Sequence, residues 1–148
     1  MTKRKYPLTY KEFKEIYSKV PKLCVEVAIR TKKGYLLTFR TKNGWVNKWH
    51  LPGGTVHYRE KISDCVSRVA EEELGVKVAV EKFLGYIEYF SEEKERGFGY
   101  SVSLVFLCKP LSDNYKLDDQ AEKLDFFNKP PKNTVREHIE FFKRLEAK

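Results

Sequence analysis

The sequence lacks any long hydrophobic run and has few cysteines. No segment approaches about 18 consecutive apolar residues, and charges occur throughout the first twenty residues. Neither a membrane span nor a signal peptide is therefore expected. The three cysteines, Cys24, Cys65 and Cys108, are odd in number, far apart and set in apolar segments. This pattern excludes a CxxC metal site and predicts reduced core residues in a cytoplasmic protein.

The sequence also lacks internal repeats and long runs of one charge. Its 148 residues are 41% hydrophobic and 14% aromatic, which argues against disorder and suffices for one domain with a sizeable core. Lys and Arg number 29 against 21 Asp and Glu, a net charge of +8, which favours an anionic ligand such as a nucleotide. Because the lysines are scattered, the alternative is a solvated basic surface, and nucleic acid is not expected as the main partner.

The rest of the chain is organised around the stretch from Leu51 to Val76. Gly53 and Gly54 permit a tight turn there, and no glycine or proline follows until Gly75. Since Gly75 stands where a C-terminal cap belongs, the spacing predicts a helix over Glu60 to Leu74. An apolar stripe of this helix is expected to face the core, and it comprises Ile62, Cys65, Val66 and Val69.

Glu73 falls on the same stripe, where an unpaired carboxylate is costly to bury. Arg68 and Glu72 lie four residues apart on one flank of the helix, so they can brace each other. Two adjacent carboxylates directed at a glycine turn with a free carbonyl suit a hard divalent ion such as Mg2+. The alternative is an ordinary amphipathic helix in which Glu73 lies at the edge of the buried face.

The flanking segments predict a mixed architecture. Thr9 to Glu12 has the spacing of a capping box, so a helix is expected over Tyr10 to Ser18. That helix either packs on the domain or forms the arm of a homodimer. Cys24 to Arg30 and Tyr35 to Phe39 alternate like the two strands of a hairpin.

The second half of the chain predicts more strands and a last helix. The expected elements are strands within Val76 to Phe90 broken near Glu81 or Gly85, a charged loop over Ser91 to Arg96, a strand over Phe98 to Cys108, a polar loop over Pro110 to Asp119, and a short strand over Leu124 to Phe127. Thr134 to Glu137 repeats the capping-box spacing and opens a final helix. Together these elements predict an α+β fold with a mixed sheet sandwiched between helices.

The fixed spacings of the central stretch resemble a known motif. Gly54, Glu60, Arg68 and the run Glu72 to Val76 are similar to the box of the Nudix hydrolase family, G-x5-E-x7-R-E-U-x-E-E-x-G-U with U an apolar residue. The similarity covers about Cys24 to Phe127. It implies a single Nudix-like α/β/α sandwich over residues 1–148, with a helical extension at 1–21, the box at 51–76 and a C-terminal helix at 132–148.

The resemblance implies hydrolysis of a nucleoside diphosphate linked to another group, with Mg2+, or Mn2+ in its place, neutralising the diphosphate. The carried-over ligands are the carbonyl of Gly53 and the carboxylates of Glu72 and Glu73. Arg68 would orient Glu72, and Glu60 would support the loop or complete the metal cluster.

Three further residues are expected to contact the substrate. Arg40 matches a family position that often contacts phosphate, which guanidinium geometry suits; a surface arginine at a strand end is the alternative. Trp45 could stack on a nucleobase, whereas Trp49 is expected to close the core beneath the glycine turn. Tyr100 could line the cleft, with sheet packing as the alternative.

One position departs from the family pattern. Where the family has Glu directly after the box Arg, this chain has Val69. GDP-mannose mannosyl hydrolases also lack that Glu, and they attack the sugar carbon instead of phosphorus. The chain resembles them at Arg40-Thr41 and at Asp119-Gln120, where their Gln binds the metal. It differs from them in having Ala121 in place of their catalytic His and Thr55 in place of an Arg.

Without that histidine, a general base must come from elsewhere, and Glu122, Asp119 and His57 are the candidates. Three functions therefore remain open. The first is a Mg2+-dependent hydrolase of a nucleotide sugar of the GDP-mannose type. The second is a conventional Nudix enzyme that attacks phosphorus of another nucleotide or dinucleotide, and the third is a Nudix-fold nucleotide-binding module without catalysis.

Overall fold

The computed structural model describes residues 6–147. Residues 1–5 of the expected N-terminal extension and residue 148 of the expected C-terminal helix lie outside this range. The elements are, in chain order, α1 (Tyr10–Tyr17), β1 (Lys22–Thr31), β2 (Gly34–Arg40), β3 (Trp49–His50), β4 (Gly53–Thr55), α2 (Ile62–Leu74), β5 (Val78–Glu88), α3 (Glu92–Arg96), β6 (Ser101–Pro110), β7 (Ala121–Phe127) and α4 (Arg136–Glu146).

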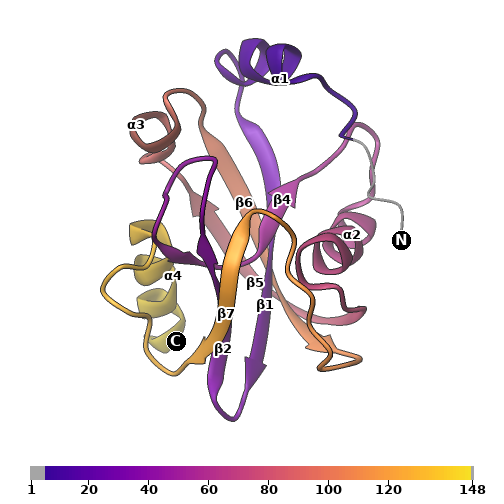
Figure 1. Cartoon of the computed structure of the whole chain (residues 1–148), viewed down its shortest axis with the longest axis vertical. Coiled ribbons are helices and arrows are strands. Elements are labelled where there is room, and N and C mark those ends of the chain that lie inside the picture. Colours follow the sequence, from indigo (N-terminus) through magenta and orange to yellow (C-terminus); the bar gives the residue numbers. More distant parts are fainter. Residues whose placement is uncertain (1–5, 148) are drawn as a thin grey trace.

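The strand β1 is the centre of a mixed sheet. It pairs in parallel with β6 and antiparallel with β2 and β4. Beyond these neighbours, β5 pairs with β6, while β3 and β7 both pair with β2. The helices α2 and α4 lie on opposite sides of the strands (Figure 1). The predicted α+β fold with a mixed sheet between helices is confirmed.

Alternate residues of β1 serve two separate cores. Val25, Val27 and Ile29 pack with the apolar stripe of α2, whereas Ala28 belongs to the cluster that contains Phe141 and Phe142 of α4. Since side chains alternate along a strand, Glu26 lies on the same side as Ala28. The three cysteines are free and buried, as predicted.

The helix boundaries confirm one capping box and correct another. The side chain of Thr9 accepts from the Glu12 backbone N–H at 3.1 Å, and Glu12 accepts from the N–H of Thr9 at 3.0 Å. The capping box at Thr134 is wrong, because Val135 is the N-cap of α4 and has no side-chain cap. Instead of capping its own helix, Glu137 accepts hydrogen bonds from the backbone N–H and the hydroxyl of Ser91.

Two other predictions change in detail. The expected charged loop over Ser91 to Arg96 is wrong, because Glu92–Arg96 forms the short helix α3. The breaks expected near Glu81 or Gly85 occur as two register shifts inside the single strand β5. No helix among residues 6–147 is both long enough and apolar enough to cross a membrane.

Candidate active site

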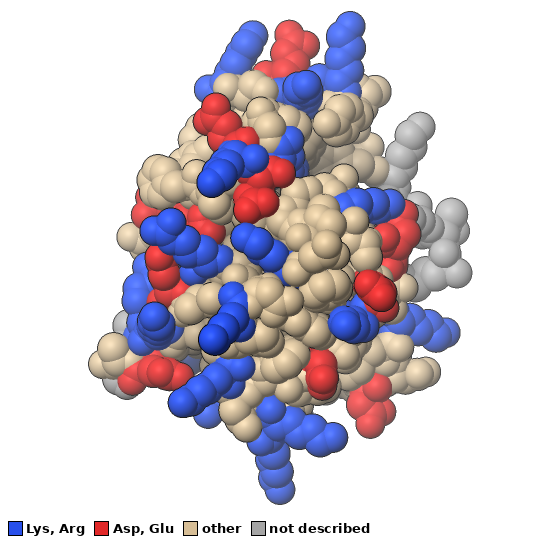
Figure 2. Space-filling view, turned by 60° about the vertical axis from the view of Figure 1, so that its left-hand side comes forward, with Lys and Arg blue, Asp and Glu red and all other residues tan. Residues whose placement is uncertain are grey.

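A cavity of about 380 Å³ opens between β1, the β4 turn and the helices α1, α2 and α3. Three alternate residues of β1, Lys22, Cys24 and Glu26, line it. Figure 2 shows basic and acidic side chains interspersed over one face of the molecule. Inside the cavity, by contrast, acidic and basic side chains are concentrated at two different ends.

We call the first of these the carboxylate end, which comprises Glu26, Gly53, Glu72, Glu73 and Asp118. The second, the cationic end, comprises Phe13, Lys22, Glu92 and Arg96. All nine residues line the cavity.

Arg68 organises the carboxylate end. Its Nε donates to Glu60 at 2.8 Å, its Nη1 donates to Glu72 at 3.1 Å, and its Nη2 donates to the carbonyl of Thr55 at 2.8 Å. The contact between Arg68 and Glu72 that the spacing predicted is therefore present. Hydrogen bonds from Arg68 lower the pKa of Glu60 to about 2. Glu60 also accepts from the N–H of His57 at 3.0 Å, so it supports the loop that precedes α2.

Two carboxylates converge on Gly53. The backbone of Gly53 is near enough to Glu73 to oppose part of the rise in the pKa of that carboxyl group. A Cβ at Gly53 would lie only 1.9 Å from Oε2 of Glu26, so any side chain at this position would clash. Burial raises the pKa of Glu73 well above its usual value, and the charges of Asp118 and Glu26 raise it further. The carboxylate end thus concentrates negative charge that a bound cation would relieve.

The residues of this end fit a hard divalent ion. No group of three or more His, Cys, Asp or Glu side chains within residues 6–147 is already arranged as a metal site. The ligand set expected from the sequence contains only two carboxylates, Glu72 and Glu73, with the carbonyl of Gly53 and the amide of Gln120. Oxygen donors of this kind, completed by water, are what Mg2+ takes. All four of these residues line the cavity.

A chain of hydrogen bonds fixes Glu26 from behind. The N–H of Leu51 donates to Nδ1 of His138 at 3.0 Å, so we assign the ring proton to Nε2, which donates to the hydroxyl of Tyr89. Tyr89 in turn donates to Oε1 of Glu26 at 2.7 Å, and Ser103 donates to the same oxygen at 3.0 Å. Burial lowers the pKa of His138 to about 3 and raises that of Glu26 to about 8. Oε2 of Glu26 is left to face Gly53 and the cavity.

The cationic end is held by one buried ion pair. Lys22 donates to Oε2 of Glu92 at 2.9 Å, and both side chains are buried. Ser101 donates to the other oxygen of Glu92. Nε of Arg96 lies 3.7 Å from Oε2 of the same carboxylate. This end therefore contains two cations and one carboxylate.

The three expected substrate contacts occupy different places. Arg40 lines the cavity, but its Nε donates to the carbonyl of Gly44 and its Nη2 to that of Asn43, each at 2.9 Å, so it also holds the loop after β2. Trp45 lines the cavity, and its ring N–H donates to Ser91 at 3.0 Å. Tyr100 is not among the lining residues, and its hydroxyl donates to Glu88.

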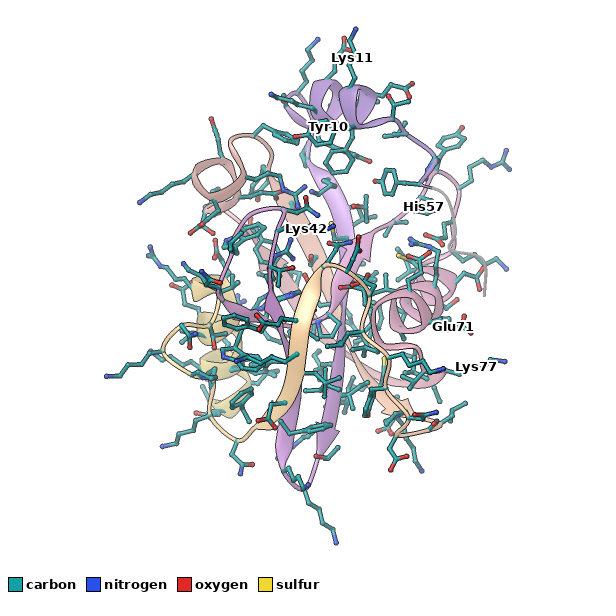
Figure 3. The ribbon with its side chains drawn as sticks, in the orientation of Figure 1. Tyr10, Lys11, Lys42, His57, Glu71 and Lys77 are labelled. Carbon is teal, nitrogen blue, oxygen red and sulfur yellow. The ribbon has the colours of Figure 1, made fainter. Side chains whose placement is uncertain are left out.

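None of the base candidates named from the sequence lines the cavity. Glu122 is exposed on β7. Asp119 pairs with Lys42 at 2.9 Å and thereby joins the loop before β7 to the loop after β2. His57 packs its ring against Tyr6 (Lys42 and His57 are labelled in Figure 3). A general base that acts in the cavity would therefore be one of its lining residues.

Sequence reasoning missed Glu26 and Asp118, which both line the cavity. A usable signal existed for Glu26, because a carboxylate inside the apolar run of a central strand needs a partner or a function. Val69 does line the cavity, with its Cγ2 2.9 Å from a Cβ placed on Gly54. The box carboxylate that the chain lacks would therefore have faced this space.

Comparison with known proteins identifies the fold and the motif independently. A sequence model of the NUDIX domain matches residues 21–144. The chain is 34% identical over 132 residues to the low-salt glycan biosynthesis protein Agl8 of Haloferax volcanii, which covers 87% of this chain and 84% of that one. It is 31% identical over 108 residues to an ADP-ribose pyrophosphatase of Methanocaldococcus jannaschii, covering 73% and 62% of the respective chains.

Among solved structures, the MutT protein from Methanosarcina mazei Go1 is similar with a TM-score of 0.75 at 22% identity. The similarity covers 87% of this chain and 96% of that one. At this level of identity, the similarity indicates a shared fold and nothing about function.

Proposed function

Because the chain belongs to the NUDIX domain family and is a Nudix-type hydrolase, we propose that it is a Mg2+-dependent hydrolase of a nucleoside diphosphate linked to a sugar, of the GDP-mannose type. The observation that carries the proposal is the brace at Arg68, which turns Glu72 towards the same cavity that Glu73 enters beside Gly53. A diphosphate needs such a cation site because negative charge builds up on it as it leaves the sugar.

Glu72, Glu73, the carbonyl of Gly53 and the amide of Gln120 would hold the metal. When bound, Mg2+ neutralises the diphosphate and stabilises it as a leaving group. Arg40 faces the same cavity with a guanidinium group that suits phosphate oxygens. Glu71, the neighbouring carboxylate of the helix, is directed away from the sheet and takes no part (Figure 3).

We assign the proton-accepting role to Glu26. Its Oε2 faces Gly53, while Tyr89 and Ser103 hold its Oε1. Burial raises the pKa of Glu26 to about 8, closer to neutrality than that of an exposed carboxyl group, as a general base requires. Glu26 thus supplies a carboxylate to a cavity in which Val69 supplies none.

Two relatives support a substrate that joins a nucleotide to a sugar. One is named for glycan biosynthesis, and the other is named for the cleavage of ADP-ribose. The name of the second relative also fits the alternative reaction, attack on phosphorus, since a pyrophosphatase breaks a bond to phosphorus. The apolar Val69 at the position of the family carboxylate favours attack on the sugar carbon in this chain.

Turnover in 18O water distinguishes these reactions. The purified chain is incubated with Mg2+ and a panel of nucleoside diphosphate sugars that includes GDP-mannose and ADP-ribose, and the products are analysed by mass spectrometry. We expect the label in the released sugar. Label in phosphate would replace the proposal with attack on phosphorus, and nucleotide binding without turnover on any member with Mg2+ or Mn2+ would indicate a binding module.

A further inference from the structure

The cavity has a defined direction along β1. Lys22, Cys24 and Glu26 are alternate residues on one side of this strand, and all three line the cavity. At about 3.3 Å per residue, the Cα atoms of Lys22 and Glu26 lie about 13 Å apart. A diphosphate bound at the carboxylate end, as the proposed function requires, would therefore leave the cationic end to one terminal group of the substrate.

The cationic end has two cations, one carboxylate and an aromatic lining, so it carries a net positive charge. Both oxygens of Glu92 are occupied, one by Ser101 and the other by Lys22. Nζ of Lys22 lies 4.8 Å from the centre of the Phe13 ring. Tyr6 and Leu8 line the same cavity ahead of α1. Flat apolar walls of this kind suit a nucleobase better than a hydroxylated sugar.

Arg96 is the group whose hydrogen-bonding capacity remains open. Its guanidinium carbon lies 5.7 Å from the ring centre of Phe13 and 6.0 Å from that of Phe98, so aromatic rings flank the group. Its Nη2 makes a long hydrogen bond of 3.4 Å to the carbonyl of Asn43. Its Nε is buried and lies 3.7 Å from Oε2 of Glu92, too far for a hydrogen bond, and it makes no other hydrogen bond within residues 6–147. A buried donor of this kind calls for an acceptor.

We propose that the cationic end binds the nucleobase of the substrate and that the edge of Arg96 selects guanine. Guanine presents two adjacent acceptors, O6 and N7, that a guanidinium can engage together. Adenine places an amino donor beside N7, so one N–H of Arg96 would meet another donor. The segment from Tyr6 to α1 thereby becomes one wall of a base pocket.

Binding of the bare nucleoside diphosphates GDP, ADP and UDP by isothermal titration calorimetry tests this assignment. These ligands carry no sugar to be hydrolysed, so the comparison holds even if the proposed reaction is wrong. We expect GDP to bind about 5- to 150-fold more tightly than ADP, which is the usual discrimination of one bidentate contact. The titrations are run with Mg2+ and again with EDTA, because a base contact is independent of the metal.

Arg96→Met is expected to abolish the preference for GDP, and Arg96→Lys, which keeps the charge without the planar fork, is expected to lose most of it. Arg136→Met is the matched control, because Arg136 is exposed on α4 and pairs with Glu140 outside the cavity. Circular dichroism establishes that each variant is folded. Equal binding of the three nucleotides by the unaltered chain would overturn the assignment, as would a preference that survives in Arg96→Met. A uniform loss of affinity for all three in Arg96→Met would place Arg96 on the phosphates and overturn it equally.

Discussion

Two residues of the carboxylate end, Glu72 and Glu73, lie with their neighbour Arg68 on the single helix α2. In the cationic end, Phe13 and Lys22 lie on α1 and β1, whereas Arg96 comes from α3, far away in the chain. In the first case, the helical repeat alone brings the side chains together. In the second, only the pairing of β1 with β6 and the packing of α1 and α3 do so. Contacts between residues that are close in the sequence can be predicted from their spacing. Contacts that depend on the pairing of distant strands cannot.

The largest effect is expected from breaking the ion pair of the cationic end. In Glu92→Leu, the buried ammonium of Lys22 loses its carboxylate, so we expect the free energy of unfolding in urea to fall by about 3–5 kcal/mol. The double variant Lys22→Met with Glu92→Leu should recover much of this loss. Glu93→Leu, at an exposed neighbouring position, is the control. A loss in Glu92→Leu no larger than in this control would mean that the pair does not hold the end together.

A smaller effect is expected at the brace of the carboxylate end. Glu60→Gln removes the charged partner of Arg68 and should cost about 1.5–3 kcal/mol at neutral pH. Because the folded pKa of Glu60 is lowered to about 2, its contribution is complete above its ordinary pKa of 4.5 and is lost as the pH falls towards 2. Urea unfolding at several pH values should show the difference between the two proteins shrinking below pH 4.5. A difference that stays constant down to pH 2 would contradict the assigned pairing.

The smallest effect is expected from breaking the chain of hydrogen bonds that joins His138 and Tyr89 to Glu26. Tyr89→Phe removes the donor to Glu26 and the acceptor for Nε2 of His138, so we expect a loss of about 1–2 kcal/mol in thermal or urea unfolding. Tyr86→Phe is the matched control, since Tyr86 lies three residues earlier, on β5, with its side chain half exposed. Equal stabilities of the two variants would show that the chain of hydrogen bonds contributes nothing.

These contrasts also explain how far the sequence could be interpreted. The glycine turn and Gly75 predicted the box helix, and the four-residue spacing of Arg68 and Glu72 predicted their contact, because each of these signals spans a few residues. The role of Glu137 could not be predicted, since its partner Ser91 lies on a different element. The base candidates were drawn from residues near a matched motif, whereas Glu26 reaches the cavity only through the position of β1 in the sheet.

The central claim is that Glu73, at the carboxylate end of the cavity, is a ligand of the proposed Mg2+ ion. Its most direct test is the Mg2+-dependent turnover of a nucleoside diphosphate sugar by Glu73→Gln, with Glu71→Gln as the control on the outer side of the same helix. We expect Glu73→Gln to lose about 100-fold or more of the turnover, since the charge of one ligand is removed while its shape is kept. Glu71→Gln should keep the activity of the unaltered chain. Equal turnover in both variants would contradict the account.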